Sequence, residues 1–119
     1  MDILALPLSP LAPELDTLEL CTLLLEQPVP FTLLDVLPVA LFVMGHLPCA
    51  LSAPAHHLRW LAPQRVSDRS APVVLYGSGA RCTALRDARD TLAALGYTHV
   101  ASYPGGRRAW AAEALPFVR

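Results

Sequence analysis

The residues best suited to chemistry lie in one short loop, which follows the apolar run Pro72-Val73-Val74-Leu75-Tyr76. The loop reads Gly77-Ser78-Gly79-Ala80-Arg81, and Cys82 follows at once. Small residues let several backbone N–H groups turn toward one point, and the arginine adds positive charge, so the loop is predicted to bind an anion. A thiolate is a nucleophile, and a thiol pKa falls at the start of a helix. Cys82, at the first turn of a helix predicted for 83–95, is therefore the candidate nucleophile.

The other cysteines and the histidines are weaker candidates. Cys21, Cys49 and Cys82 are an odd number of cysteines at wide spacing, which fits neither a disulfide framework nor a set of zinc ligands, so we expect reduced thiols. His56 and His57 have no cysteine or acidic residue at a supporting spacing, and we predict no metal site and no cofactor. For Cys82, the alternative to catalysis is a small side chain packed against a sheet.

Segments typical of strands and helices alternate along the chain and must position this loop. Short apolar or β-branched runs predict strands at 3–6, 31–36, 50–52, 72–76 and 98–101. Apolar residues at helical spacing predict helices at 18–26, 38–44, 55–61, 83–95 and 107–115. Thr17 is the predicted N-cap of the first helix, and Trp60 and Trp110 are expected to pack helices against the sheet. This alternation predicts an α/β domain with a parallel sheet covered on both faces.

Length and composition restrict the class of protein. The chain has 119 residues, 54% of them hydrophobic, which suffices for one core, predicted for 16–119, after an extended Pro/Leu-rich arm at 1–15. A net charge of −1 offers no basic face for nucleic acid. Prolines interrupt the uncharged stretch 36–58, so we expect no membrane span. No secretory signal pattern is present at the N-terminus, which predicts a cytoplasmic protein.

Five short motifs resemble, in order and spacing, those of the rhodanese-like domain family. They are Leu34-Asp35-Val36, Gly45-His46-Leu47-Pro48-Cys49-Ala50, Val73-Val74-Leu75-Tyr76, Leu95-Gly96-Tyr97 and Gly105-Gly106-Arg107-Arg108-Ala109-Trp110. The resemblance implies a single domain with a five-stranded, mostly parallel sheet, helices on both faces, and an active site where the strand ends at Tyr76. It also implies structural roles for six motif residues, which are Asp35, Gly45, His46, Gly105, Gly106 and Trp110.

The loop departs from the family pattern at its most important position. Similar enzymes carry a cysteine directly after the tyrosine, but here Gly77 follows Tyr76, and the loop to Arg81 is one residue shorter. Sulfur transfer needs a thiolate, which glycine cannot supply. We therefore predict a catalytically inactive module that acts through binding, regulation or anion sensing. The alternative is a sulfurtransferase that uses Cys82 as an atypical nucleophile, with Arg81 beside it.

A second departure concerns the helix predicted after Val36. Members of the family carry arginine and then glutamate on this helix, whereas this chain has Leu37, Ala40 and Leu41. The helix is apolar on every side, although a helix that covers a sheet needs only one apolar face. We expect the N-terminal arm, or a second subunit or partner protein, to cover its apolar residues, which include Leu37, Leu41, Val43 and Met44. The candidate partners are therefore a second copy of the chain or another protein at this helix, and a small anion at the loop.

Overall fold

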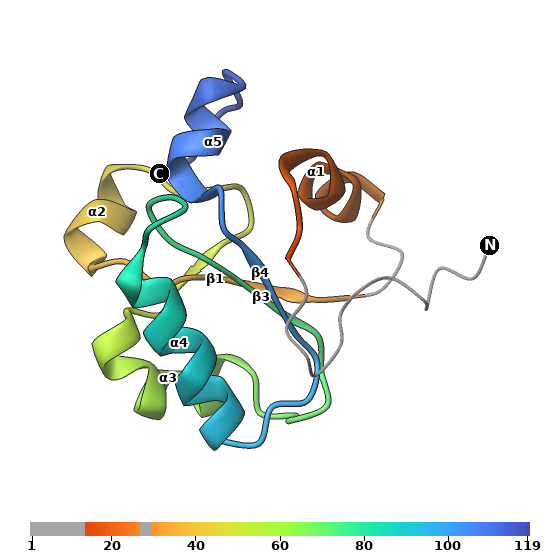
Figure 1. The fold of residues 1–119 in the computed structure, drawn as a ribbon, viewed down its shortest axis with the longest axis vertical. Coiled ribbons are helices and arrows are strands. Elements are labelled where there is room, and N and C mark those ends of the chain that lie inside the picture. Colours follow the sequence, from red (N-terminus) through yellow and green to blue (C-terminus); the bar gives the residue numbers. More distant parts are fainter. Residues whose placement is uncertain (1–13, 27–29) are drawn as a thin grey trace.

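Helices and strands alternate along the whole chain (Figure 1). The computed structural model describes residues 14–26 and 30–119. The helices are α1 (Thr17–Glu26), α2 (Val39–Met44), α3 (Leu58–Arg65), α4 (Thr83–Ala94) and α5 (Gly106–Ala112), with a short 3₁₀ helix, η2 (Ala55–His57), before α3. The strands are β1 (Thr32–Asp35), β2 (Leu51–Ser52), β3 (Val73–Tyr76) and β4 (Val100–Tyr103). The largest difference from the prediction is at α3, which continues past Leu61 to Arg65.

The strands form a parallel sheet in the order β2-β1-β3-β4. The register pairs Asp35 with Tyr76 and Tyr76 with Tyr103, so the loops that follow these strands meet at one edge. The sheet has four strands in the described residues, rather than the five that the resemblance implied. The predicted strand at 3–6 lies outside those residues, and only an isolated parallel bridge between Glu14 and Ser102 extends the sheet beyond β4.

Helices cover both faces of the sheet, as predicted (Figure 1). Successive side chains of a strand point to opposite faces, so Val73 and Leu75 enter the core beneath α3 and α4, whereas Val74 and Tyr76 enter the core beneath α1 and α5. All four residues of β3 are buried, which explains why this strand reads as a continuous apolar run. Trp110 of α5 is buried against the sheet, as expected.

The start of α1 differs from the prediction by one residue. The Glu19 N–H donates to Asp16 Oδ1 at 2.8 Å, and the Asp16 N–H donates to Glu19 Oε1 at 3.0 Å. This reciprocal pair satisfies two of the N–H groups that a helix start leaves without partners. Thr17, the predicted N-cap, instead forms a hydrogen bond of 2.7 Å between its hydroxyl and that of Tyr103. Asp16 is therefore the capping residue.

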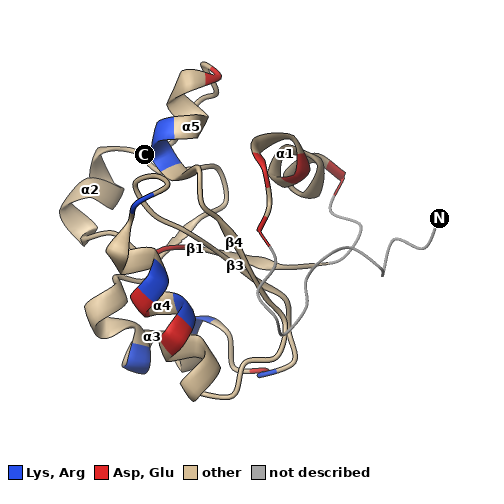
Figure 2. Cartoon of the chain, in the orientation of Figure 1, with Lys and Arg blue, Asp and Glu red and all other residues tan. Residues whose placement is uncertain are grey.

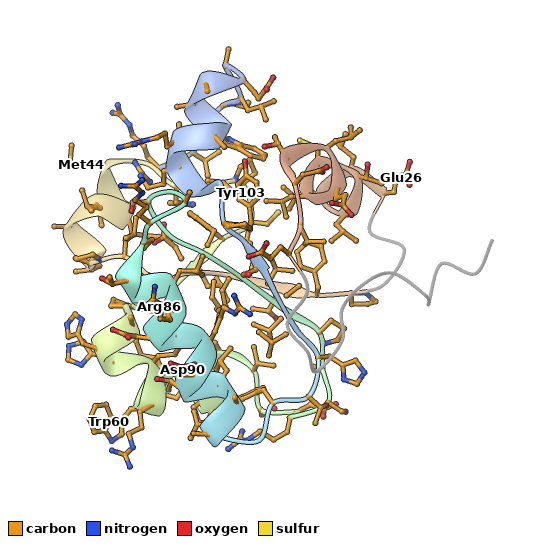
Figure 3. All side chains as sticks on the ribbon, viewed as in Figure 1. Glu26, Met44, Trp60, Arg86, Asp90 and Tyr103 are labelled. Carbon is orange, nitrogen blue, oxygen red and sulfur yellow. The ribbon has the colours of Figure 1, made fainter. Side chains whose placement is uncertain are left out.

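Two apolar side chains lie elsewhere than expected. Trp60 is 62% exposed and points away from the core (Figure 3), because Leu58 and Ala62, four residues apart, occupy the buried side of α3. Leu37 is buried in the core and so cannot belong to a partner surface. Phe42 packs against the core, whereas four other apolar residues of that segment are exposed, namely Val39, Leu41, Val43 and Met44. Among the residues described, no helix is long and apolar enough to cross a membrane.

Candidate active site

The candidate site lies at the edge of the sheet where β3 ends. The loop of residues 77–81 leads from Tyr76 to Cys82, which precedes α4 as its N-cap residue and has an extended backbone (φ −75°, ψ 109°). The Cys82 N–H donates to the Gly79 carbonyl at 3.1 Å, which closes the loop into a tight turn. The predicted position of Cys82 at the start of the helix is confirmed.

The sulfur of Cys82 fills the space that the missing side chain of Gly77 leaves. A Cβ atom added to Gly77 would lie 2.4 Å from Cys82 Sγ and 3.3 Å from Cys82 Cβ. The first distance is far below van der Waals contact, so no side chain at residue 77 is compatible with the sulfur in this position. The similarity to the family implies a nucleophilic cysteine at residue 77. In this chain, a thiol reaches the same region from residue 82.

Amide groups of the loop and of α4 act on this sulfur. Partial burial raises the pKa of the Cys82 thiol, but hydrogen bonds from the Ser78 N–H and hydroxyl, together with the N–H groups of Leu85 and Ala84, outweigh burial and bring the pKa below its ordinary value. Ala84 and Leu85 lie in the first turn of α4, where N–H groups have no partner within the helix. One amide of the loop that was predicted to bind an external anion, that of Ser78, is thus directed at the protein's own sulfur, and its hydrogen bond favours the thiolate, the reactive form of cysteine.

The first residues of α5 hold the loop in place through backbone hydrogen bonds. The Arg107 N–H donates to the Gly77 carbonyl at 3.0 Å, and the Arg108 N–H donates to the Ser78 carbonyl at 2.9 Å. Gly106 makes this approach possible, because a Cβ atom on it would lie 2.4 Å from the Gly77 oxygen and its φ is +58°. The Gly-Gly motif therefore lets α5 hold the loop in position.

A cavity of about 250 Å³ opens beside the loop, lined by Ser78, Gly79, Ala80, Arg81 and Arg108. Arg81 and Arg108 are both exposed, and no acidic residue lines the cavity. Two guanidinium groups beside a small cavity favour a negatively charged ligand. Sequence reasoning identified Arg81 but missed Arg108, for which the only signal was its position directly after the Gly-Gly motif and Arg107.

A buried pair of polar side chains joins β1 and β3 at the same edge. The Tyr76 hydroxyl donates to Asp35 Oδ2 at 2.6 Å and accepts from the Leu47 N–H at 3.1 Å, while the Leu37 N–H donates to Asp35 Oδ1 at 2.9 Å. Burial raises the pKa of Asp35 even though these hydrogen bonds oppose it. Burial and the adjacent carboxyl group also raise the pKa of Tyr76. Through these hydrogen bonds, Asp35 and Tyr76 connect the end of β1 and the turn at Leu47 to β3, the strand that leads into the loop.

The turn that begins at Gly45 contacts the end of the chain. His46 Nδ1 lies 2.9 Å from the Leu47 carbonyl oxygen, and its ring stacks on Phe42 with centroids 4.0 Å apart. The backbones of His46 and Val118 exchange two hydrogen bonds of 2.8 Å. Arg107 donates to the Gly45 carbonyl oxygen. Gly45 and His46 therefore lie in a turn that the last residues and α5 hold from two sides.

The remaining candidates lie away from the loop. His56 and His57 are exposed, with ring centroids 4.1 Å apart. Cys21 of α1 is half-buried against the core, Cys49 is exposed, and all three cysteines are free thiols. Across 14–26 and 30–119, no three His, Cys, Asp or Glu side chains are grouped as a metal site would require.

Comparison with known proteins places this arrangement in a family. Residues 17–113 match the family of the Rhodanese-like domain. The rhodanese-like domain of an Anabaena protein is 27% identical, with a TM-score of 0.77 over 89% of this chain and 78% of that one. A Bacillus halodurans protein is 22% identical, with a TM-score of 0.81 over 91% of this chain and 77% of that one. A rhodanese from E. coli is 24% identical, with a TM-score of 0.63 over 76% of this chain and 99% of that one.

Among curated proteins, no sequence matches the chain. The family match nevertheless covers α1 through α5 and includes the loop, Cys82 and the Gly-Gly motif. The order of the strands, the position of the loop at the end of β3 and this match lead to the same assignment: the chain belongs to the family of rhodanese-like domains.

Proposed function

We propose that this chain is a sulfurtransferase whose nucleophile is Cys82. The observation that carries the proposal is the position of the Cys82 sulfur, which takes up the space at Gly77 beneath the amides of the loop and of α4. The prediction of an inactive module rested on the absence of a thiol from residue 77. A thiol that reaches the same region from residue 82 removes the main reason for that prediction.

The reaction would have two steps, and the electrons balance in each. The Cys82 thiolate attacks the sulfane sulfur of a donor, the bond between that sulfur and the donor's leaving group breaks, and the leaving group departs with the electron pair. The product on the protein is a persulfide of Cys82. A thiolate acceptor then attacks the outer sulfur, the S–S bond to Cys82 breaks, and Cys82 leaves as a thiolate with the electron pair while the acceptor carries the sulfur away as a persulfide. Ser78, Ala84 and Leu85 stabilise the negative charge of that thiolate.

A second function, binding or regulation without turnover, is supported by a different observation. The loop from Tyr76 to Arg81 is one residue shorter than the family pattern, and the cavity lined by Arg81 and Arg108 suits an anion whether or not a reaction follows. In this case Cys82 has a structural role only, as a small, partly buried side chain that packs against the core beneath α3 and α4. The two functions differ in whether sulfur becomes covalently attached to Cys82.

Mass spectrometry of the protein after incubation with thiosulfate tests the proposal. We expect one added sulfur on Cys82, lost in Cys82→Ser and retained in the matched controls Cys21→Ser and Cys49→Ser. Turnover to cyanide or a thiol should be lost with the adduct. If no adduct forms, and turnover equals that of a variant without cysteines, binding without turnover is the remaining function.

A further inference from the structure

The short helix α2 exposes apolar side chains over most of its circumference. Val39, Val43 and Met44 are 58%, 63% and 68% exposed, and Leu41 is 41% exposed. Phe42 packs against the core and holds the inner side of the helix, whereas Met44 points outward (Figure 3). The four exposed residues form the α2 surface, an apolar patch of roughly a few hundred Å², the size at which such a patch marks an interaction site.

A groove of about 420 Å³ begins at the N-terminal end of this helix. Its walls come from the end of β1, the residue before α2, η2 and the first two turns of α4, and they are formed by Val36, Pro38, Ala55, His56, Thr83, Ala84 and Asp87. Four of these seven residues are apolar, so the groove suits an apolar side chain. Pro38 lines the groove and Val39 follows it directly, and the groove therefore continues the α2 surface.

The first described residue of the chain lies far from α2. Glu14 forms its bridge with Ser102 beyond β4, at the opposite edge of the sheet from β2, and α1 lies across the molecule from α2 (Figure 1). The thirteen residues before Glu14 span at most about 45 Å when fully extended. Because the longest axis of the molecule is 35 Å, they would need most of that length to reach α2, and few would remain to cover it. A second copy of the chain has no such limit.

The α2 surface and the groove are complementary to each other in a second copy. A two-fold axis brings the same surface of both copies together, and two helices that face each other across the axis run antiparallel. Because α2 has six residues, its two ends are only about 9 Å apart. Met44 at the end of one helix would then lie beside Val39 of the other, where the partner's groove opens. A methionine side chain is unbranched and fills irregular apolar spaces well.

We infer that two copies of the chain associate through antiparallel α2 helices, and that Met44 of each copy occupies the groove of the other. Both copies bury the α2 surface and the walls of the groove, so the interface amounts to roughly 1,000 Å², near the lower limit for specific association. Residues 37–45 include no charged side chain, so the two helices do not repel each other. This area predicts a dimer that dissociates in the micromolar range. The inference does not depend on the function of Cys82.

Disulfide trapping tests the antiparallel arrangement. Copies with Val39→Cys and copies with Met44→Cys are mixed and oxidised, in a chain whose Cys21, Cys49 and Cys82 are replaced by serine. Residue 39 of one copy should lie beside residue 44 of the other, and disulfides need Cα atoms within about 7 Å, so the mixed disulfide should exceed each homodisulfide by roughly tenfold.

The matched control for trapping is a mixture of Leu18→Cys and Leu25→Cys copies, two exposed positions on α1, which should pair at random. Random pairing of the Val39→Cys and Met44→Cys copies, or the absence of disulfides between them, would overturn the inference.

Sedimentation equilibrium of the full chain tests the role of Met44. Met44→Gln places an amide in the apolar groove and should raise the dissociation constant of the dimer by roughly tenfold. Met44→Leu keeps an apolar side chain of similar volume and should change that constant by less than about threefold. Equal constants in the two variants would contradict the inference. So would a full chain that stays monomeric at millimolar concentration, including one that associates only when residues 1–12 are removed.

Discussion

At the scale of single residues, the site depends on a glycine and a cysteine five positions apart. Gly77 has no side chain, and the Cys82 sulfur lies 2.4 Å from the point that a Cβ atom of residue 77 would occupy. The two residues are therefore coupled: the absence of a side chain at one determines where the other can place its thiol. Hydrogen bonds from Ser78, Leu85 and Ala84, which offset the burial of the sulfur, then lower the thiol pKa.

This coupling predicts the effect of a single methyl group. Gly77→Ala should displace the Cys82 sulfur from the amides and slow its alkylation by iodoacetamide at neutral pH by roughly tenfold, since the rate follows the fraction of thiolate. The matched control is Gly79→Ala in the same loop, where a Cβ atom would come no closer than 3.5 Å to its neighbours. An alkylation rate in Gly77→Ala equal to that of the natural chain would show that the thiolate does not need this position.

At the scale of elements, α5 and the loop are held together by the backbone. Two hydrogen bonds join the start of α5 to the Gly77 and Ser78 carbonyls, and Gly106 has both a positive φ and a close contact with the Gly77 oxygen. Gly96, after α4, also has a positive φ, of +92°, but an added Cβ atom would meet nothing within 4 Å. An alanine at residue 96 would therefore suffer backbone strain alone, whereas an alanine at residue 106 would suffer backbone strain and a steric clash.

Urea unfolding of two alanine variants measures that difference. Gly96→Ala should lower the free energy of unfolding by about 1 to 2 kcal/mol, the cost of a left-handed conformation for a residue with a side chain. Gly106→Ala adds a clash with the Gly77 oxygen and should lower the free energy of unfolding by roughly 3 kcal/mol or more. Equal losses in the two variants would mean that α5 can move away from the loop at little cost.

At the scale of the whole molecule, charge is distributed unevenly although the net charge is only −1. The segment that contains α1 carries acidic residues and no arginine or lysine, whereas basic residues lie at the start of α5 and on the loop before α4 (Figure 2). Two of them, Arg81 and Arg108, line the same cavity. The apolar surface is also uneven. Val39, Val43 and Met44 of α2 are more than half exposed, and Met44 points outward in Figure 3. The surface formed by the loop, the start of α5 and the exposed side of α2 is therefore the part of the described molecule most suited to contacts with other molecules.

Sedimentation velocity tests the expectation that α2 is covered by a second subunit. We expect the full chain to sediment as a dimer at micromolar concentration, and Val43→Glu to shift it to monomer, because burial of a charge at an apolar interface is unfavourable. Leu25→Glu is the matched control, since Leu25 is an exposed leucine of α1 on another surface. If the full chain is a monomer and removal of residues 1–12 makes it associate, the N-terminal arm covers α2 instead.

The sequence by itself determined the class of fold, the order of most elements and the place of the candidate loop between β3 and α4. These features follow from local patterns: the apolar run of β3, the helical spacing in α4, the stop at Gly96, and a loop of small residues between strand and helix. The same local reasoning put the first N-cap one residue late and oriented Trp60 inward, because capping and the buried side of a short helix depend on contacts with other elements.

Only the tertiary structure decided what the site contains. Whether the Cys82 sulfur turns toward the space at Gly77 depends on the backbone of the N-cap residue and on the amides around it, which no spacing in the sequence specifies. The position of Arg108 depends on α5 approaching the loop, an arrangement that joins residues about thirty positions apart through hydrogen bonds to the Gly77 and Ser78 carbonyls. Residue types along the chain indicated a vacant position after Tyr76, and packing between distant segments determined which side chain fills it.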